Sequence, residues 1–296
     1  MTTIVRIRPA RSTVTPPRHP VPHGAWDTHA HVFGPRELFP QSPTRSYVAP
    51  TQGVDRYLGV LDALGIRHGV LVQPSVYHQD NSCLLAALDE APDRLVGVVD
   101  VDVLDTPDDV LHSMTRRGVV GLRVQWPGNH SVDRLRATAD RLAELGWHLD
   151  LRVAGARALT DLAPVLAASP VPVMIESMGS PRAGESLQSS GFRSLFDLLT
   201  EPGRYVKLSH VYQVDASGPP YRGATPFARA LIEHAPDRLV WGSDWPHPMP
   251  PDEFLPDDGA LVDLVPHWTG DADTTRLILR DNPFRFYRPR SQGGLS

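Results

Sequence analysis

Residues 26–34 read Trp-Asp-Thr-His-Ala-His-Val-Phe-Gly, and this stretch predicts a β-strand over about residues 25–31. Successive side chains of a strand point to opposite faces, so His29 and His31 point the same way. Two imidazoles on one face can bind a metal, hold a reacting carbonyl or orient a base. The alternative interpretation is a pair of surface histidines on an edge strand. Features elsewhere in the sequence are needed to distinguish a functional histidine pair from surface histidines.

Apolar segments and helical patterns alternate along most of the remaining sequence. Continuous apolar strands that alternate with helices indicate a buried parallel sheet. Eight such units in 296 residues predict an α/β protein with a single-domain (β/α)₈ TIM barrel. The rival, a doubly wound open sheet, usually carries a GxGxxG turn after its first strand, and none follows here. The predicted strands are 25–31, 68–74, 95–100, 119–125, 148–153, 171–177, 205–210 and 239–245, and the predicted helices are 54–65, 81–91, 107–117, 132–145, 159–168, 192–200 and 226–235.

Two segments stand outside this alternation. Residues 1–23 form a proline-rich N-terminal arm without periodicity, which we expect to lie over the surface or to be partly disordered. The barrel domain then spans residues 24–296. Residues 34–52 form a long loop that contains Tyr47, and a loop of this length in a compact domain is often functional.

Composition and charge narrow the class of protein. The formal net charge of −5 gives no electrostatic reason for binding nucleic acid or an anionic membrane. No apolar run approaches the roughly 20 residues that span a bilayer, and the first 22 residues lack the apolar core of a secretory signal. Cys83 is the single cysteine and lies in an apolar helical pattern, which indicates a core position and excludes an internal disulfide or a cysteine metal cluster. We therefore expect a cytoplasmic enzyme or binding protein, whose oligomeric state the sequence does not indicate.

Polar residues gather where the predicted strands end, which is where a TIM barrel carries its chemistry. Each is costly to bury without a partner, so their convergence indicates an active site. For Lys207, Asp100 and Asp150 we favour a structural interpretation, as ion pairs inside the barrel. The strand-end residues are His29, His31, Gln73, Ser75, Asp100, Asp102, Arg123, Gln125, Asp150, Arg152, Glu176, Ser177, Lys207, Ser209, His210 and Asp244.

Asp244 ends the last predicted strand, which lies beside the first strand in a closed barrel. It should therefore face His29 and His31. A carboxylate between imidazoles can take a proton from water, while the imidazoles hydrogen-bond an acyl oxygen. The alternative role for Asp244 is a helix N-cap, but Pro246 and Pro248 favour a loop at this point.

Several of these motifs resemble one enzyme family. Residues 27–31, 241–248 and 279–287 are similar to the amidohydrolase superfamily, and the similarity covers roughly residues 24–288. Within that superfamily the chain looks most like the 2-pyrone-4,6-dicarboxylate lactonase-like branch. The segments that carry this narrower similarity are 46–50, 72–75, 121–123 and 217–220.

The resemblance implies a TIM barrel that hydrolyses a cyclic ester from aromatic catabolism. It makes Asp244 the general base on water, while His29 and His31 hold the carbonyl and orient the water. Tyr47, Ser75 and Arg123 match positions that contact substrate in that branch. The pyrone lactonase works without a metal, whereas most of the superfamily binds one or two divalent ions.

The sequence departs from the branch in three places. Ser177 stands where a histidine is usual, and a hydroxyl is a poor metal ligand; His210 is a candidate to compensate for it. Asn129 and Gln213 stand where the pyrone lactonase has arginines that hold carboxylates. Arg152 stands where an uncharged residue is usual, and an arginine at a barrel mouth can bind a carboxylate bidentately. These changes predict a substrate that carries an acid group, but not the same two groups.

Three interpretations follow. The first is a hydrolase that opens a small carboxylated lactone without a required cofactor, with no nucleic-acid or membrane partner. The second adds zinc or manganese on His29, His31 and Asp244, which would allow amide or lactone hydrolysis or decarboxylation. The third is a degenerate barrel that binds small acids without turning them over. In the first, the catalytic residues are Asp244, His29 and His31, and the substrate-binding residues are Arg123, Arg152, Tyr47, Ser75, Ser177 and His247.

Overall fold

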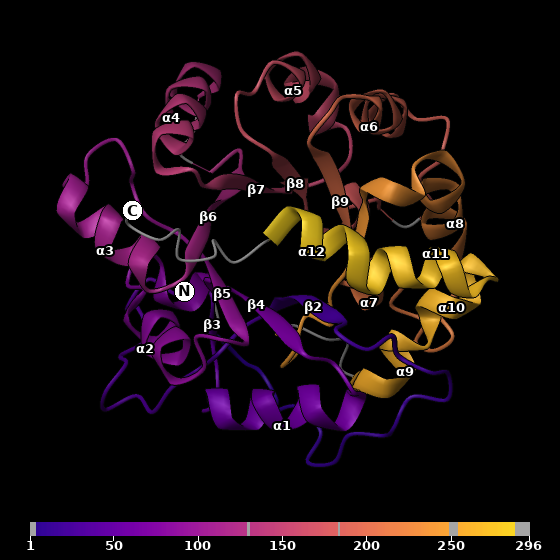
Figure 1. Cartoon of the computed structure of the whole chain (residues 1–296), viewed down its shortest axis with the longest axis horizontal. Helices are drawn as coiled ribbons and strands as arrows, with labels where there is room; N and C mark the ends of the chain where they lie inside the picture. Colours follow the sequence, from indigo (N-terminus) through magenta and orange to yellow (C-terminus); the bar gives the residue numbers. More distant parts are fainter. Residues whose placement is uncertain (1–3, 129–130, 183, 249–253, 288–296) are drawn as a thin grey trace, which may run out of the picture.

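The computed structural model describes residues 4–128, 131–182, 184–248 and 254–287. Eight strands lie side by side, each parallel to the next, and helices surround them (Figure 1). The predicted (β/α)₈ barrel is confirmed. In the order of the sheet the strands are β2 (Trp26–Ala30), β4 (His68–Val72), β5 (Leu95–Val99), β6 (Val119–Trp126), β7 (His148–Val153), β8 (Val173–Ile175), β9 (Arg204–Leu208) and β10 (Leu239–Trp241).

The helices lie close to the predicted ranges because their ends carry clear stop signals. The helix α1 ends at Gly65 and α4 ends at Gly146, and both glycines adopt the left-handed conformation that terminates a helix. The helix α4 begins after Ser131, whose hydroxyl accepts the N–H of Arg134. The barrel helices are α1 (Val54–Leu64), α2 (Ser82–Glu90), α3 (Asp108–Arg116), α4 (Val132–Leu145), α5 (Ala158–Ala167), α6 (Ser190–Thr200) and α8 (Thr225–His234).

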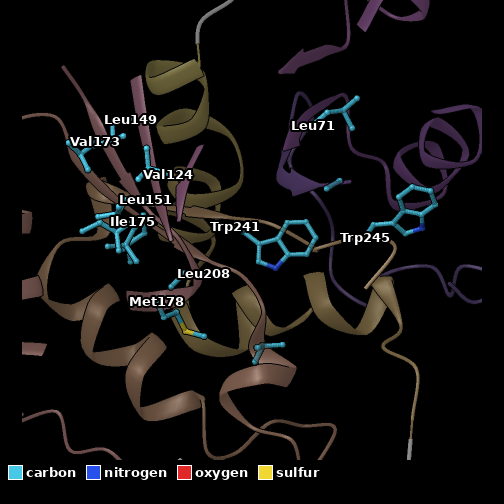
Figure 2. Close-up of a cluster of buried hydrophobic side chains, with 14 of the residues drawn as sticks. Leu71, Val124, Leu149, Leu151, Val173, Ile175, Met178, Leu208, Trp241 and Trp245 are labelled. Carbon is cyan, nitrogen blue, oxygen red and sulfur yellow. The ribbon is translucent and has the colours of Figure 1, made fainter. Parts of the chain in front are cut away.

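The strand β7 shows how one strand serves the core and the site. Its side chains alternate, so Leu149 and Leu151 join the aliphatic cluster outside the sheet, together with residues of β6 and β8 (Figure 2). The three polar side chains of this strand alternate with these leucines and point into the barrel. His148 lies among aromatic rings, Asp150 pairs with Lys207, and Arg152 lines a cavity. Hydrophobic burial therefore fixes the direction in which the polar residues point.

The barrel closes between β2 and the segment that follows β10. The N–H of Asp244 donates to the carbonyl of His29 at 2.8 Å, and the N–H of His31 donates to the carbonyl of Trp245 at 2.7 Å. Gly242 is required at this closure because a Cβ there would lie 2.6 Å from His29 Cβ and 2.8 Å from its backbone nitrogen. The histidines of the first strand and the aspartate of the last are thus joined through their backbones.

Asp27 reinforces the closure from the side. Its carboxylate accepts the backbone N–H of Ser243 at 2.8 Å and the Ser243 hydroxyl at 2.6 Å. The hydroxyl of Tyr57 donates to the second oxygen of the same carboxylate. The Thr28 hydroxyl also donates across the closure, to the Trp241 carbonyl at 2.8 Å, so residues 27–31 contain two residues for the closure and two for the candidate site.

Residues 4–23 of the proline-rich arm lie on the surface and pair with the long loop. The arm strand β1 (Val5–Arg6) runs parallel to β3 (Tyr47–Val48) of that loop. Farther along, the Thr15 hydroxyl donates to Asp257, and the backbone of Arg18 donates to Asp263. These contacts tie the arm to two distant parts of the chain.

The C-terminal elements cover one end of the barrel. They are α9 (Asp258–Val262), α10 (Leu264–Thr269), α11 (Ala272–Arg276), the π-helical turn η4 (Leu277–Asp281) and α12 (Asn282–Tyr287). Figure 1 shows α12 over the centre of the ring of helices. Its Asn282 side chain donates to the carbonyls of Pro236 and Leu239, both at 2.8 Å. The rings of Phe286 and Tyr287 then pack against His148 inside the barrel.

The remaining short elements are η1 (Ser75–Tyr77), η2 (Ser177–Gly179), α7 (Val211–Val214) and η3 (Pro236–Arg238). Cys83 is buried in α2, as predicted. Over residues 4–128, 131–182, 184–248 and 254–287, no helix combines the length and the apolar character that crossing a bilayer requires.

Candidate active site

Asp244 lies at the centre of three imidazole rings. Its Oδ1 atom is 2.9 Å from His210 Nε2, 3.3 Å from His31 Nε2 and 3.6 Å from His29 Nε2. All four residues are buried. The predicted convergence of Asp244 with His29 and His31 is therefore present, and His210 joins them from the end of β9.

Backbone turns at the strand ends aim these side chains into the barrel mouth. Ser177, His210 and Asp244 have φ values of 56°, 54° and 61°, in the left-handed region that residues other than glycine rarely adopt. Each follows a buried strand that ends two or three residues earlier. The apolar strands hold these turns in place, and three of the left-handed residues other than glycine therefore lie at the candidate site.

The ring contacts indicate where the histidine protons lie. A carbonyl only accepts, so Nδ1 of His31 donates to the Val72 carbonyl at 2.7 Å. His29 Nδ1 lies 3.4 Å from the Lys207 ammonium, which only donates, so this nitrogen is the acceptor and Nε2 carries the proton. Deduced from hydrogen-bond partners, these assignments give the two histidines opposite tautomers.

The surroundings keep Asp244 ionised. Burial alone would raise the pKa of Asp244, but the contacts with His210 and His31 outweigh burial and hold that pKa well below its usual value. Burial lowers the pKa of His29 and of His210. A buried carboxylate beside neutral imidazoles can accept a proton from water.

Sequence reasoning missed Tyr212. Its hydroxyl donates to Asp244 Oδ2, and burial followed by the charge of Asp244 raises the pKa of Tyr212 well above its usual value. Tyr212 therefore stays a neutral donor. The available signal was its position two residues after His210, at the same strand end.

Ser177 contacts His210 directly. The Ser177 hydroxyl lies 2.9 Å from His210 Nδ1, and the opposite ring nitrogen of His210 faces Asp244. Ser177, which stands where a histidine is expected, is therefore linked to Asp244 through His210.

Two buried ion pairs lie beneath the histidines. Arg123 binds Glu176 bidentately, at 2.9 and 2.8 Å, and also donates to the Gln73 carbonyl. Burial opposes the charge on Glu176, but Arg123 outweighs it and holds the pKa of Glu176 below its usual value. Lys207 pairs with Asp150, so the predicted structural ion pair is confirmed for these two residues.

Two cavities lie beside the residues that surround Asp244, although Asp244 and His29 themselves line neither of them. The inner cavity, of about 50 Å³, is large enough for water. The outer cavity, of about 630 Å³, is of the size that holds small molecules. The inner cavity is lined by His31, Tyr47, Pro74, Ser75, Arg123, Arg152, His210, Gln213 and Pro248. The outer cavity is lined by Ser46, Tyr47, Ser75, Gln125, Trp126, Arg152, Val153, Ala154, Ser177, Ser180, Pro181, Arg182, Gln213 and Val214.

Five of the six predicted substrate-binding residues line one or both of these cavities. Tyr47, Ser75 and Arg152 line both cavities, Arg123 lines the inner one and Ser177 the outer one. Burial raises the pKa of Tyr47 to about 12, so it remains a neutral hydrogen-bond donor.

His247 is placed differently from the other predicted contacts. Its Nε2 pairs with Asp258 at 3.1 Å, and its ring packs against Tyr212. It lines neither cavity. Asn129, the position where an arginine is expected, lies outside the described residues.

His29, His31 and Asp244 are also arranged so that a metal ion could bind between them. Ligand atoms of His29, His31 and Asp244 all lie within 4.8 Å of one another. Within the described part of the chain, His29 Nε2 and Asp244 Oδ1 are buried and have no hydrogen-bond partner of good geometry. The proton on His29 Nε2 opposes coordination, because moving it to Nδ1 would direct an N–H at the Lys207 ammonium.

The chain is similar to several known proteins. The amidohydrolase family model matches residues 26–288. A 4-sulfomuconolactone hydrolase of Rhizobium radiobacter is 36% identical over 283 residues and 94% of each chain. A 2-pyrone-4,6-dicarboxylate hydrolase of Comamonas testosteroni is 33% identical, over 92% of this chain and 93% of the other. A crystal structure of a probable 2-pyrone-4,6-dicarboxylic acid hydrolase from Acinetobacter baumannii, with citric acid bound, is 26% identical, with a TM-score of 0.79 over 89% of this chain and 99% of that one.

Proposed function

The chain belongs to the amidohydrolase family, and from that premise we propose that it is a hydrolase that opens a lactone carrying an acid group, in the breakdown of aromatic compounds. The observation that carries this proposal is the position of Asp244. It is buried among three imidazoles, next to an inner cavity lined by His31 and His210 and an outer cavity lined by arginines.

Asp244 acts as the general base on a water molecule in the inner cavity. As it takes a proton, the water oxygen adds to the lactone carbonyl, and His29 and His31 hold the carbonyl and orient the water. The ring C–O bond then breaks. The proton held by Asp244 passes to the departing ring oxygen, so the product is a ring-opened acid and no external reactant besides water is needed.

Arg152, Tyr47 and Ser75 bind the rest of the substrate. All three line both cavities, so they can contact a molecule that extends from the inner cavity to the outer one. Arg123 forms part of the inner wall, but Glu176 already neutralises its charge. Arg152 is therefore the stronger candidate for binding an acid group.

Ring opening of a panel of carboxylated lactones tests this function. We expect turnover of at least one member, and a loss of about 10²- to 10⁴-fold in kcat for Asp244→Asn with little change in the binding of unreactive acids. Tight binding of an acid without turnover of any lactone would instead support the degenerate, acid-binding barrel.

A metal-dependent hydrolase is the second candidate, and the closeness of His29, His31 and Asp244 favours it. A divalent ion bound there, zinc or manganese, would supply a Lewis acid that polarises the carbonyl and acidifies water. His31 suits this role, because its Nδ1 proton is already bound to the Val72 carbonyl and leaves Nε2 free. The contact between Lys207 and His29 favours the metal-free candidate, which we place first.

A further inference from the structure

Residues 4–23 of the N-terminal arm contact two parts of the chain that are far apart in the sequence and that both support the candidate site. Near its start, the arm pairs with the loop that carries Tyr47. Farther along, it binds residues 254–263, which include α9. The reaction proposed above uses no residue of the arm, so these contacts require a separate explanation.

The first contact sets the backbone of Tyr47. Val5 of β1 lies opposite Tyr47 in the parallel pair, and the Ile7 N–H donates to the Val48 carbonyl at 3.0 Å. Ile7 is buried in the main apolar cluster, so the pairing is anchored in the core. Among the described residues, β3 has no strand neighbour other than β1. The arm therefore fixes the backbone from which Tyr47 reaches both cavities.

The second contact places the arm on the first turn of α9. The Thr15 hydroxyl donates to Asp257 Oδ2 at 2.6 Å, and Oδ1 of the same carboxylate accepts the Ala260 N–H at 3.1 Å. Asp257 therefore caps the helix and holds the arm at the same time. A Cβ at Gly259 would lie 1.9 Å from the Thr15 carbonyl oxygen, so the two backbones are in direct contact here.

The helix α9 connects the arm to the proposed base. Asp258 pairs with His247 Nε2 at 3.1 Å, and both side chains are buried. The His247 ring packs against Tyr212, whose hydroxyl donates to Asp244. The backbone N–H of His247 also donates to the Asp244 carbonyl at 2.7 Å. Packed side chains and hydrogen bonds of this kind can transmit a displacement between distant sites. His247, which lines neither cavity, therefore supports Asp244.

We propose that the arm positions the active site through these two separate contacts. Ile7 and its neighbours in β1 hold Tyr47 for substrate binding. Thr15 holds α9 and, through His247, the orientation of Asp244. The inference rests on the proposed function, because Tyr47 and Asp244 have their roles only there. Ile7 and Thr15 are positioning residues and touch no reacting atom. The first contact therefore governs affinity for the substrate, and the second governs the rate of proton transfer.

Steady-state kinetics of full-length variants, with a lactone that the wild-type protein opens, test the first contact. Ile7→Pro removes the N–H that the Val48 carbonyl accepts, so we expect KM to rise about tenfold while kcat changes less than about threefold. Ile7→Ala is the matched control, because it keeps the N–H and loses more of the side chain, and its KM should stay within about twofold of the wild-type value. A similar KM in both variants would overturn this contact.

Variants at the second contact should show the opposite division. In Gly259→Ala the new methyl group must displace Thr15 or α9, so we expect kcat to fall about tenfold with KM within about twofold. Thr15→Val removes only the hydroxyl and should lower kcat about threefold, and Thr15→Ser should restore it. Asp263→Ala loosens the arm at Arg18, away from Asp257, and should leave both constants unchanged. Equal losses in Asp263→Ala would mean that the arm acts through stability alone.

Two measurements without turnover separate this inference from the proposed function. Calorimetry with glutarate, an unreactive dicarboxylate, should show about tenfold weaker binding in Ile7→Pro and no change in Ile7→Ala. In protein that carries isotope-labelled histidine, the imidazole resonances that disappear in His247→Gln should shift in Thr15→Val.

The outcomes can be told apart. If lactones are hydrolysed but the kinetic changes and the shifted resonances are absent, the arm has no positioning role. If no lactone is hydrolysed, weaker glutarate binding and shifted resonances would uphold the two contacts and refute the lactonase. Absence of all these effects would overturn both.

Discussion

The Ser177 hydroxyl lies 2.9 Å from Nδ1 of His210, whose Nε2 lies 2.9 Å from Asp244. Because Asp244 is ionised, Nε2 of the neutral His210 ring carries the proton, and Nδ1 accepts from Ser177. Removing the hydroxyl in Ser177→Ala leaves a buried ring nitrogen without its partner and frees the ring to turn. We expect kcat to fall by about tenfold while KM changes little.

Steady-state kinetics and thermal unfolding together check this prediction. The melting temperature of Ser177→Ala should stay close to that of the wild-type protein, because alanine keeps the left-handed backbone at no greater cost than serine. An unchanged kcat would show that the ring of His210 is held by packing alone.

Tyr212 holds the other oxygen of Asp244. Tyr212→Phe keeps the ring and removes one hydrogen bond to a charged group, so we expect kcat/KM to fall by about tenfold to a hundredfold. The matched control is Tyr221→Phe, because the buried Tyr221 hydroxyl has no hydrogen-bond partner among the described residues. Equal losses in the two variants would contradict a specific role for Tyr212.

His148 makes the fold sensitive to acid. Burial, with a further contribution from Lys207, lowers the pKa of His148 from 6.5 to about 3. Between these values the unfolded chain binds a proton that the native chain does not, so stability falls as the pH drops from 6.5 toward 3. The slope from this residue is about 1.4 kcal/mol per pH unit.

Urea denaturation at pH 6.5 and pH 5 measures this effect. In His148→Phe the difference in unfolding free energy between the two pH values should be about 2 kcal/mol smaller than in the wild-type protein. An identical difference in both proteins would assign the acid sensitivity to other groups.

Gly242 is essential to the closure of the barrel. In Gly242→Ala the new methyl group would press on the backbone of His29, so we expect a loss of about 1–3 kcal/mol in stability and a disproportionate loss of kcat. Gly59→Ala is the matched control. A Cβ at Gly59 in α1 meets no atom within 4 Å, and alanine should stabilise the helix by about 0.5–1 kcal/mol.

Exhaustive chelation distinguishes the two candidate mechanisms. We expect lactone hydrolysis to survive chelation, because the Lys207 contact favours a proton on the His29 nitrogen that a metal would need. Loss of activity that zinc or manganese restores would instead assign His29, His31 and Asp244 as ligands. Metal content of the purified protein, measured in parallel, reports on binding independently of turnover.

The barrel was predictable because its strands are continuous apolar runs with helices between them. The expectation that active-site residues lie at strand ends also placed Asp244 beside His29 and His31. Asp244 is far from the two histidines in the sequence. The contact of Tyr212 with Asp244 was not predictable. It depends on the left-handed turn at His210, which leaves no periodic pattern in the sequence.

Two further features also left no recognisable pattern in the sequence: the placement of His247 and the pairing of β1 with β3. His247 follows the last strand and resembles a site residue in sequence, but a turn with φ of 62° directs it to Asp258. The arm and the long loop pair as β1 and β3 through segments of only two residues each, which are too short for any alternation to be recognised.

The closure of the barrel joins residues near the two ends of the chain, and these residues also form the candidate site. During synthesis, the ribosome releases His29 and His31 long before Asp244. In the proposed mechanism, a nascent or truncated chain therefore contains the histidines without the base. Hydrolysis by that mechanism begins only after the last strand has docked on the first.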